Sequence, residues 1–117
     1  DGLLWIGSQV SGLYIYDPEK HATQNINVSH GIPDNTTRSI IGDGKGNVWV
    51  SARCEVYKIS KATMEITLCG SPDNMNFSYN TNSSRCTPSG LILFGSKNHI
   101  AIFTFILHRH FHYLLQA

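Results

Sequence analysis

A repeat with a period of 44 residues constrains the fold of this chain more than any other feature. The segment that starts at Trp5 aligns with the segment at Trp49, and both align with the segment at Leu93. Each segment is preceded three positions earlier by a glycine and is followed by a second apolar stretch; the glycines are Gly2, Gly46 and Gly90. A recurring unit of this length indicates an array of similar structural modules.

Each repeat predicts short strands separated by tight turns, because β-branched and aromatic residues alternate with Gly, Pro, Asp and Asn. The strands expected in the first repeat are Leu3–Ile6, Leu13–Tyr16, Asn25–Ser29 and Arg38–Ile41. The second strands of the later repeats are expected at Val56–Ile59 and Ile100–Phe103. A turn at Gly31–Asn35 is echoed at Gly70–Asn74.

Four strands in 44 residues predict an all-β chain built from β-propeller blades. The 117 residues hold roughly 2.7 repeats. We therefore expect two four-stranded blades and an incomplete third, forming an arc of a ring of about seven or eight blades. The repeats are expected at residues 1–44, 45–88 and 89–103, followed by an atypical tail at 104–117.

Charge and hydropathy exclude several classes of protein. The nine Lys and Arg residues are scattered against eight Asp and Glu, so no basic stripe predicts a nucleic-acid partner. The longest apolar run, Ile100–Leu107, is far shorter than the about 20 residues of a membrane helix. The chain opens without an initiating Met or a basic leader, so we expect a segment of a longer protein.

Cysteine and asparagine patterns carry little specific chemistry. The three cysteines, Cys54, Cys69 and Cys86, have no C-x-x-C spacing and allow at most one disulfide. We expect them to be small buried side chains. Four N-x-S/T sequences occur, at Asn27, Asn35, Asn76 and Asn82; they would be glycosylation acceptors only in a suitable host, and otherwise they are turn residues.

No catalytic constellation is visible. The acids in predicted turns (Asp17, Asp34, Asp43 and Asp73) are not paired by any sequence feature, although glycoside hydrolysis needs two facing carboxylates. No His is followed by Asp or Glu as in a kinase phospho-acceptor box. We therefore expect no catalytic, cofactor-binding or metal-binding residues in this segment, and the ligand-binding residues are not identifiable from the sequence.

The two tryptophans and the segment Asp43–Asn47 each have both a functional and a structural interpretation. Trp5 and Trp49 could stack on a sugar, but their place inside a repeated strand favours packing between blades. The segment Asp43–Asn47 superficially resembles a phosphate or calcium loop, yet it lacks the required spacing and predicts a hairpin turn.

The tail contains an alternating row of histidines at positions His108, His110 and His112. On a strand these residues share one face and could bind Zn²⁺. No acidic or cysteine partner lies nearby in the sequence, so we expect no metal there.

These motifs closely resemble the two-component regulator propeller repeat. That repeat runs as a Leu-Trp-Ile-Gly-Thr strand, a Gly-Leu strand, a Gly-Leu-Pro-Asn-Asn turn and an Asp-x-x-Gly-x-Leu-Trp strand. The corresponding segments here are Gly2–Ser8, Gly12–Pro18, Gly31–Asn35 and Arg38–Val50. Ser89–Phe103 resembles the closing repeat of the family, in which Phe-Gly-Gly replaces Trp-Ile-Gly.

The resemblance implies the periplasmic sensor region of a hybrid two-component system, near the end of its second propeller. It implies a non-catalytic segment that recognises an oligosaccharide and relays a signal across the membrane, in a homodimeric parent that is a histidine kinase. The remaining blades of the parent would cover this arc. A propeller glycosidase or lyase, or a structural protein-interaction propeller, are the alternatives.

The chain departs from the family pattern at two kinds of position. Glu55 and His99 stand where the family prefers Gly ahead of the second strand. If these positions need a positive φ, each substitution is strained. The tail after Phe103 shows no family likeness, and a truncated or frame-shifted end would explain it.

Overall fold

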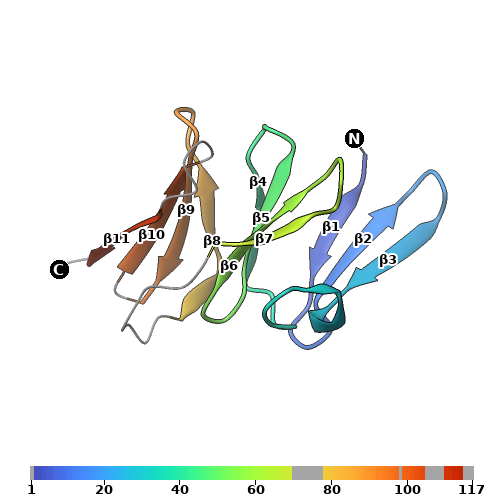
Figure 1. Ribbon diagram of the computed structural model, residues 1–117, viewed down its shortest axis with the longest axis horizontal. Coiled ribbons are helices and arrows are strands. Elements are labelled where there is room, and N and C mark those ends of the chain that lie inside the picture. Colours follow the sequence, from blue (N-terminus) through green and yellow to red (C-terminus); the bar gives the residue numbers. More distant parts are fainter. Residues whose placement is uncertain (1, 70–77, 98, 105–109, 115–117) are drawn as a thin grey trace.

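The strands of the chain form three antiparallel sheets that stand side by side (Figure 1). The computed structural model describes residues 2–69, 78–97, 99–104 and 110–114. The first sheet contains β1 (Leu4–Gly7), β2 (Leu13–Asp17) and β3 (Ala22–Ile26). The second contains β4 (Ser39–Gly42), β5 (Asn47–Ser51), β6 (Val56–Ser60) and β7 (Ile66–Leu68). The third contains β8 (Tyr79–Cys86), β9 (Leu91–Ser96), β10 (His99–Thr104) and β11 (His110–Leu114).

This architecture confirms the all-β prediction and the arrangement of part of a β-propeller. Each sheet is a meander, in which neighbouring strands in the sheet are consecutive in the chain. The part of the chain that the structure describes contains no helix long and apolar enough to cross a membrane.

The expected third strand of the first repeat, Asn25–Ser29, is wrong. The strand β3 ends at Ile26, and Val28–His30 form a 3₁₀ turn, η1. The Asn27 side chain accepts the Ser29 N–H, while the His30 ring nitrogen Nδ1 accepts the Asn27 N–H. These local side-chain bonds offer the backbone an alternative to the strand ladder, and they turn the chain toward the second sheet.

The sheets and the sequence repeats are out of phase. The strand expected at Arg38–Ile41 belongs to the first repeat of the sequence. In the structure it corresponds to β4, which pairs with β5 in the second sheet. The physical reason is the tight turn at Asp43–Asn47, which brings β4 against the strand that follows it. The first sheet consequently has three strands, and the second and third have four each.

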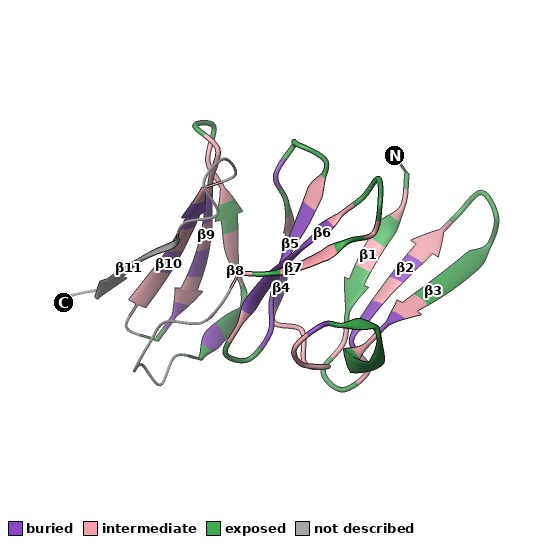
Figure 2. Cartoon of the chain, viewed as in Figure 1, coloured by how far each residue is buried: buried purple, intermediate pink, exposed green. Residues whose placement is uncertain are grey.

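The middle sheet is buried on both faces, as Figure 2 shows for β5 and β6. Successive residues of a strand point to opposite faces of its sheet. Val48 and Val50 accordingly pack with Leu13 and Ile15 of the first sheet. Trp49 points the other way, into a second cluster with residues of the third sheet. The core is therefore two layers of side chains between three sheets.

The repeated positions of the sequence occupy equivalent places in the row of sheets. Trp5 packs against the cluster shared by the first and second sheets, and Trp49 lies in the cluster shared by the second and third. In β9, Ile92 and Phe94 belong to the second cluster and face the second sheet. Leu93 stands between them in the strand, so its side chain points to the opposite face, away from the second sheet. All three therefore face the same direction along the row, as a propeller repeat requires.

The backbone also repeats. Gly2, Gly46 and Gly90 have φ values of 78°, 87° and 93°, and each lies three positions before the aligned residue of its repeat. An added Cβ would meet nothing within 4 Å at any of the three. The residue type is therefore selected there by the left-handed backbone and not by crowding.

The condition for strain at Glu55 and His99 is not met, since neither residue has a positive φ. Five residues separate the paired ends of β1 and β2, and the fifth, Gly12, has a φ of 81°. Only four residues separate the corresponding ends of β5 and β6, or of β9 and β10. The shorter β5–β6 loop closes without a left-handed residue, so Glu55 is accommodated there, and His99 likewise has no positive φ.

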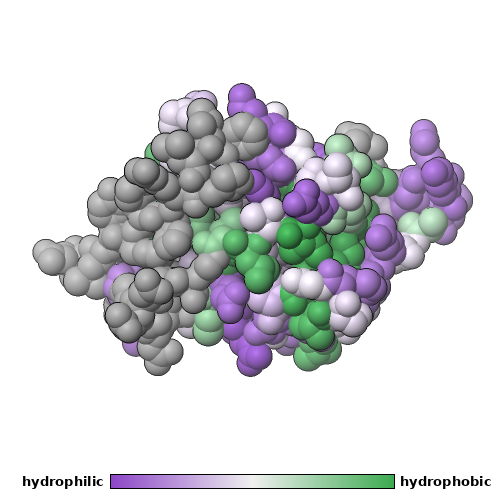
Figure 3. All heavy atoms as spheres, viewed as in Figure 1, coloured by the Kyte–Doolittle hydropathy of each residue, from purple (hydrophilic) through white to green (hydrophobic). Residues whose placement is uncertain are grey.

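The surface reflects the same division into interfaces and loops. In the view of Figure 3, hydrophobic side chains gather near the middle of the visible face, while the β2–β3 turn is hydrophilic. Among the described residues, the exposed large hydrophobic side chains include Leu4 and Ile6 of β1, which are 52% and 49% exposed.

Candidate ligand-binding site

Three connections meet at one end of the first and second sheets, the end drawn at the bottom of Figure 1. They are the β1–β2 loop, the segment from η1 to β4, and the β5–β6 loop. Together they line an open depression of about 480 Å³, here termed the loop pocket. Its lining residues are Gln9, Val10, Val28, Pro33, Asp34, Asn35, Thr36 and Arg53.

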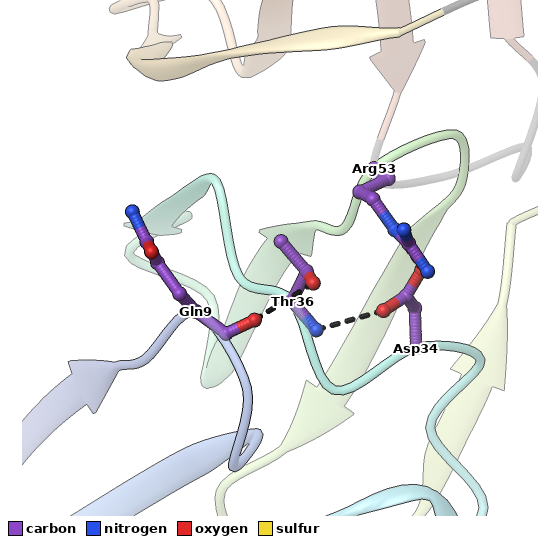
Figure 4. A network of polar contacts seen from close by, with 4 residues as sticks. All are labelled: Gln9, Asp34, Thr36 and Arg53. Carbon is purple, nitrogen blue, oxygen red and sulfur yellow. Dashed lines mark hydrogen bonds and ion pairs between the residues drawn. The ribbon is translucent and has the colours of Figure 1, made fainter.

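Asp34 organises the polar side of the loop pocket (Figure 4). One carboxylate oxygen accepts the backbone N–H of Thr36 at 2.8 Å, which forms a tight turn. The other accepts Arg53 Nε at 2.8 Å in an ion pair. The Thr36 hydroxyl donates to the Gln9 backbone carbonyl at 2.8 Å. The three connections are thus tied to one another around a single carboxylate.

Asp34 and Arg53 of the loop pocket are both charged at neutral pH. Burial acts to raise the pKa of Asp34, but hydrogen bonds from Thr36 and Arg53 and the Arg53 charge outweigh it and hold the pKa below its ordinary value. Asp34 in turn raises the pKa of the Arg53 guanidinium. The Arg53 side chain is 59% exposed, so much of its hydrogen-bonding surface faces solvent.

Backbone hydrogen bonds hold the wall of the loop pocket in place. The Gly12 N–H donates to the Asn35 carbonyl at 2.8 Å, and the Thr37 N–H donates to the Ser8 carbonyl at 2.8 Å. The Asn35 side-chain oxygen accepts the Val28 N–H at 2.9 Å. The segment from η1 to β4 is therefore fastened to the first sheet, while Arg53 belongs to the second. The lining of the loop pocket therefore comes from connections of both sheets.

A second depression, here termed the inner groove, lies along β1, β4 and β8 and measures about 480 Å³. Its lining residues are Trp5, Ile6, Gly7, Ser8, Gln9, Thr37, Arg38, Ser39, Ile40, Thr81 and Asn82. Asn82 has a φ of 55°, at an irregularity in the pairing of β8 with β9. Its N–H donates to the Arg38 carbonyl at 2.8 Å, and the hydroxyls of Ser39 and Ser84 are hydrogen-bonded, so β4 and β8 touch there.

Trp49 has the structural role that the sequence predicts. It is fully buried, and its ring lies 5.6 Å from that of Phe103 between centroids. Its indole N–H donates to Asp43 at 2.9 Å, and the Lys58 ammonium lies 5.5 Å above its ring. Trp49 therefore presents no face to a sugar.

The hairpin interpretation of Asp43–Asn47 is confirmed. Asp43 accepts the N–H groups of Lys45 and Asn47 at 2.7 and 3.1 Å, which closes the turn between β4 and β5. Burial acts to raise the pKa of Asp43, but hydrogen bonds from Trp49, Asn47 and Lys45 hold it below its ordinary value. The Asp43 carboxylate accepts its hydrogen bonds from the turn and from the Trp49 indole.

The cysteine interpretation holds only in part. The three thiols are free. Cys69 and Cys86 are partly buried against the second core cluster, and burial raises the pKa of Cys69 to about 11. Cys54 lies in the β5–β6 loop and is exposed, so its expected burial is wrong.

Some sequence hypotheses fall outside the described residues. These are the acid Asp73, the glycosylation candidate Asn76, the turn at Gly70–Asn74 and the first tail histidine, His108. His110 and His112 belong to β11, opposite Phe103 and Ala101 of β10. The zinc hypothesis remains a prediction; within the ranges that the structure describes, no three His, Cys, Asp or Glu residues form a group able to hold a metal.

Sequence reasoning did not single out the loop pocket. The sequence predicts Asp34 only as a turn acid, and none of its motifs points to Gln9, Thr36 or Arg53. The one available signal was the pattern Asp34-x-Thr36, which is typical of a carboxylate that turns the backbone back on itself. Nothing in the sequence brings Arg53 to it, because 19 positions and a complete hairpin separate the two residues.

Comparison of the whole sequence with protein-family models finds no match, and no curated protein matches either. Comparison of structures gives clear matches. The extracellular domain of BT4673 from B. thetaiotaomicron, described as a proposed one component system, has a TM-score of 0.82 and 22% sequence identity. The alignment covers 99% of this chain and 17% of that one.

A second structure of that extracellular domain, described as part of a proposed hybrid two component system, gives a TM-score of 0.81 at 22% identity, over 98% of this chain and 17% of the other. The extracellular domain of the proposed hybrid two component system BT3049 from B. thetaiotaomicron gives 0.72 at 14% identity, over 94% and 15%. The chain spans less than a fifth of each structure. It shares its fold with part of the extracellular domains of these B. thetaiotaomicron proteins.

Proposed function

We propose that this chain is part of the ligand-recognition region of an extracytoplasmic sensor and that it performs no catalysis. The observation that carries the proposal is the loop pocket, in which an ion pair between Asp34 and Arg53 joins connections of two adjacent sheets. The shared fold with extracellular domains of proposed two-component systems supports this role.

The chemistry of the loop pocket suits an oligosaccharide. A sugar hydroxyl both donates and accepts hydrogen bonds, so its site needs groups of both kinds. Asp34 offers carboxylate oxygens, Arg53 offers guanidinium N–H groups, and the Gln9 amide offers both. None of the lining residues is aromatic, so recognition here relies on hydroxyl groups instead of stacking against a sugar ring.

The position of the loop pocket also suits signalling. A ligand held between connections of the first and second sheets binds best at one relative placement of those sheets, and it stabilises that placement by its differential affinity. In a full-length parent, the shift in the relative placement of the two sheets would pass through neighbouring blades to a membrane helix and a cytoplasmic histidine kinase. We propose a periplasmic location because the chain shares its fold with extracellular domains of proposed two-component systems, and a homodimeric parent because the repeats resemble those of that family.

A glycosidase or lyase is the weaker alternative. Hydrolysis of a glycosidic bond generally needs two carboxyl groups across the scissile bond. The residues that line the loop pocket include one acid, Asp34, and its lowered pKa suits neither a proton donor nor an acid–base pair at neutral pH.

Calorimetric titration of the 117-residue chain with a panel of plant and host oligosaccharides tests the proposal. We expect saturable binding of one sugar class without product, and at least tenfold weaker binding in Arg53→Gln and Asp34→Asn. The matched control is Glu19→Gln in the exposed β2–β3 turn. Turnover of any sugar, or affinity unchanged in both pocket variants, would contradict the proposal.

A further inference from the structure

The turn η1 is closed by a reciprocal pair of hydrogen bonds between side chains and backbone. The Asn27 side-chain oxygen Oδ1 accepts the Ser29 N–H at 2.9 Å, and the His30 ring nitrogen Nδ1 accepts the Asn27 N–H at 3.0 Å. This is the arrangement of a capping box, in which the last residue is usually a Glu or Gln that accepts the N–H of the first. Here an imidazole takes that place.

The hydrogen bond between Asn27 and His30 exists only while the ring is neutral. A backbone N–H can donate but cannot accept, so His30 Nδ1 carries a lone pair, and the single proton of the neutral ring lies on Nε2. In the charged imidazole both nitrogens are donors, so an Nδ1–H group would face the Asn27 N–H. Protonation of His30 and this hydrogen bond therefore exclude each other. His30 is exposed, so solvent reaches its ring.

The described neighbours of η1 hold no second group that changes charge in the same pH range. They are β3, the segment 31–38, β7 (a Cβ added at Gly31 would lie 3.8 Å from Ile66) and, across the loop pocket, the β1–β2 and β5–β6 loops. The titratable residues of these elements and their ends are Asp34, Arg38, Arg53, Cys54, Glu55 and Glu65. Between about pH 7.5 and pH 5.5, carboxylates and guanidinium groups stay charged and thiols stay protonated, whereas an imidazole titrates.

The position of η1 connects this hydrogen bond to the loop pocket. The His30 N–H donates to the Asn27 carbonyl at 2.8 Å, and the Gly31 N–H donates to the Val28 carbonyl at 3.2 Å. A 3₁₀ turn this short has little stability of its own, so it depends on its capping side chains. The Val28 N–H donates to Asn35 Oδ1 at 2.9 Å, and both residues line the loop pocket. Opening of η1 would therefore release one side of the pocket wall.

We propose that His30 makes the wall of the loop pocket sensitive to pH: the neutral ring closes η1, and protonation of the ring opens η1 and separates Val28 from Asn35. The proton binds to Nδ1, at the lone pair that accepted the Asn27 N–H, and this N–H then bonds to water. A ligand that needs the closed wall binds more weakly in acid than at neutral pH. This effect on the ligand rests on the proposed function, whereas the switch itself rests on the hydrogen bonds of η1.

Amide hydrogen exchange of the 117-residue chain without sugar, followed by NMR at about pH 7.5 and pH 5.5, tests the proposal. The protection factor compares each amide with an unstructured peptide at the same pH, so it removes the intrinsic pH dependence of exchange. The protection factors of the Asn27 and Val28 amides should fall by about fivefold on acidification, as expected for the loss of one hydrogen bond. The Gly12 amide, which donates to the Asn35 carbonyl, should keep its protection.

Two substitutions of His30 separate the hydrogen-bond acceptor from its titration. In His30→Gln the side-chain oxygen can accept the Asn27 N–H at either pH, so the protection of Asn27 should persist in acid. In His30→Ala the acceptor is absent, so the protection should be low at both pH values. The matched control is His21→Asn, which removes the histidine of the β2–β3 turn and suits its φ of 51°. In this control the fall in protection on acidification should remain.

Three results would overturn the proposal. They are equal protection of Asn27 at the two pH values in the unsubstituted chain, a fall on acidification that persists in His30→Gln, and a fall at Asn27 without one at Val28. Failure of every sugar to bind would contradict the proposed function alone, because the exchange is measured without sugar.

Discussion

The first and second sheets contain the same strand motif in two environments. Trp49 is fully buried, bonded to Asp43 and covered by Phe103 of the third sheet. Trp5 is only partly buried, and its indole N–H has no hydrogen-bond partner among the residues that the structure describes. The flanking residues differ in the same way, since Val48 and Val50 are buried while Leu4 and Ile6 are about half exposed.

The comparison separates two contributions to the fold. The local sequence decides that each motif becomes a strand in a hairpin, and this happens in both sheets. The neighbouring strands and sheets decide whether the strand is buried and whether its polar groups are satisfied. Most of the stabilisation of a propeller blade therefore comes from its neighbours.

The largest expected difference follows from truncating the two tryptophans. Trp49→Ala should lower the free energy of unfolding by about 3–5 kcal/mol, because it opens a cavity in the second cluster. Trp5→Ala should cost less, since Trp5 is only partly buried against the first cluster. Urea unfolding followed by circular dichroism measures both. Equal losses would show that the two motifs are equally buried and would break the comparison.

The loops after the two motifs give a second contrast. Gly12→Ala should destabilise the chain by about 1–3 kcal/mol, because φ is 81° and an added Cβ would overlap the Ile26 carbonyl oxygen. Glu55→Gly, at the corresponding point of the shorter loop, should relieve no strain, since Glu55 has no positive φ. Thermal unfolding of both variants is the measurement. A gain in stability for Glu55→Gly would show that the backbone at Glu55 is strained and would contradict this prediction.

The turn carboxylate gives a smaller and pH-dependent contrast. Asp43 has a folded-state pKa below its ordinary value of 3.8, so the charged form stabilises the fold. This contribution is complete above about pH 4 and is lost as the pH falls through the folded-state value. Asp43→Asn should therefore flatten the decline in the free energy of unfolding below pH 4. A variant whose acid profile matches that of the parent chain would contradict this assignment.

These contrasts show which parts of the fold could be predicted from sequence. The strands at Trp5, Trp49 and Leu93 follow from the repeat and from local β propensity, and so does the turn at Asp43. The phase of the sheets could not be predicted from the period alone, because a period does not say which strand begins a sheet. The 3₁₀ turn after Ile26 depends on the side chains of Asn27 and His30 bonding their own backbone.

The loop pocket was less predictable than the fold. Its ion pair joins Asp34 of the segment between η1 and β4 to Arg53 of the β5–β6 loop, and the approach of these connections depends on the packing of Leu13 and Ile15 against Val48 and Val50. Such a contact is set by tertiary structure and leaves no periodic signal. Glu55 shows the opposite case. The sequence marks it as a departure from the family pattern, where Gly is preferred, but the loop is one residue shorter and accommodates it.

Exchange of the two indole protons with solvent, followed by NMR on the ¹⁵N-tryptophan-labelled chain, tests the account most directly. The account predicts that the Trp49 indole N–H is strongly protected, because it is bonded to Asp43 between two sheets. The Trp5 indole N–H should exchange markedly faster. Equal rates, or a faster exchange at Trp49, would contradict a row of sheets in which each is covered by the next.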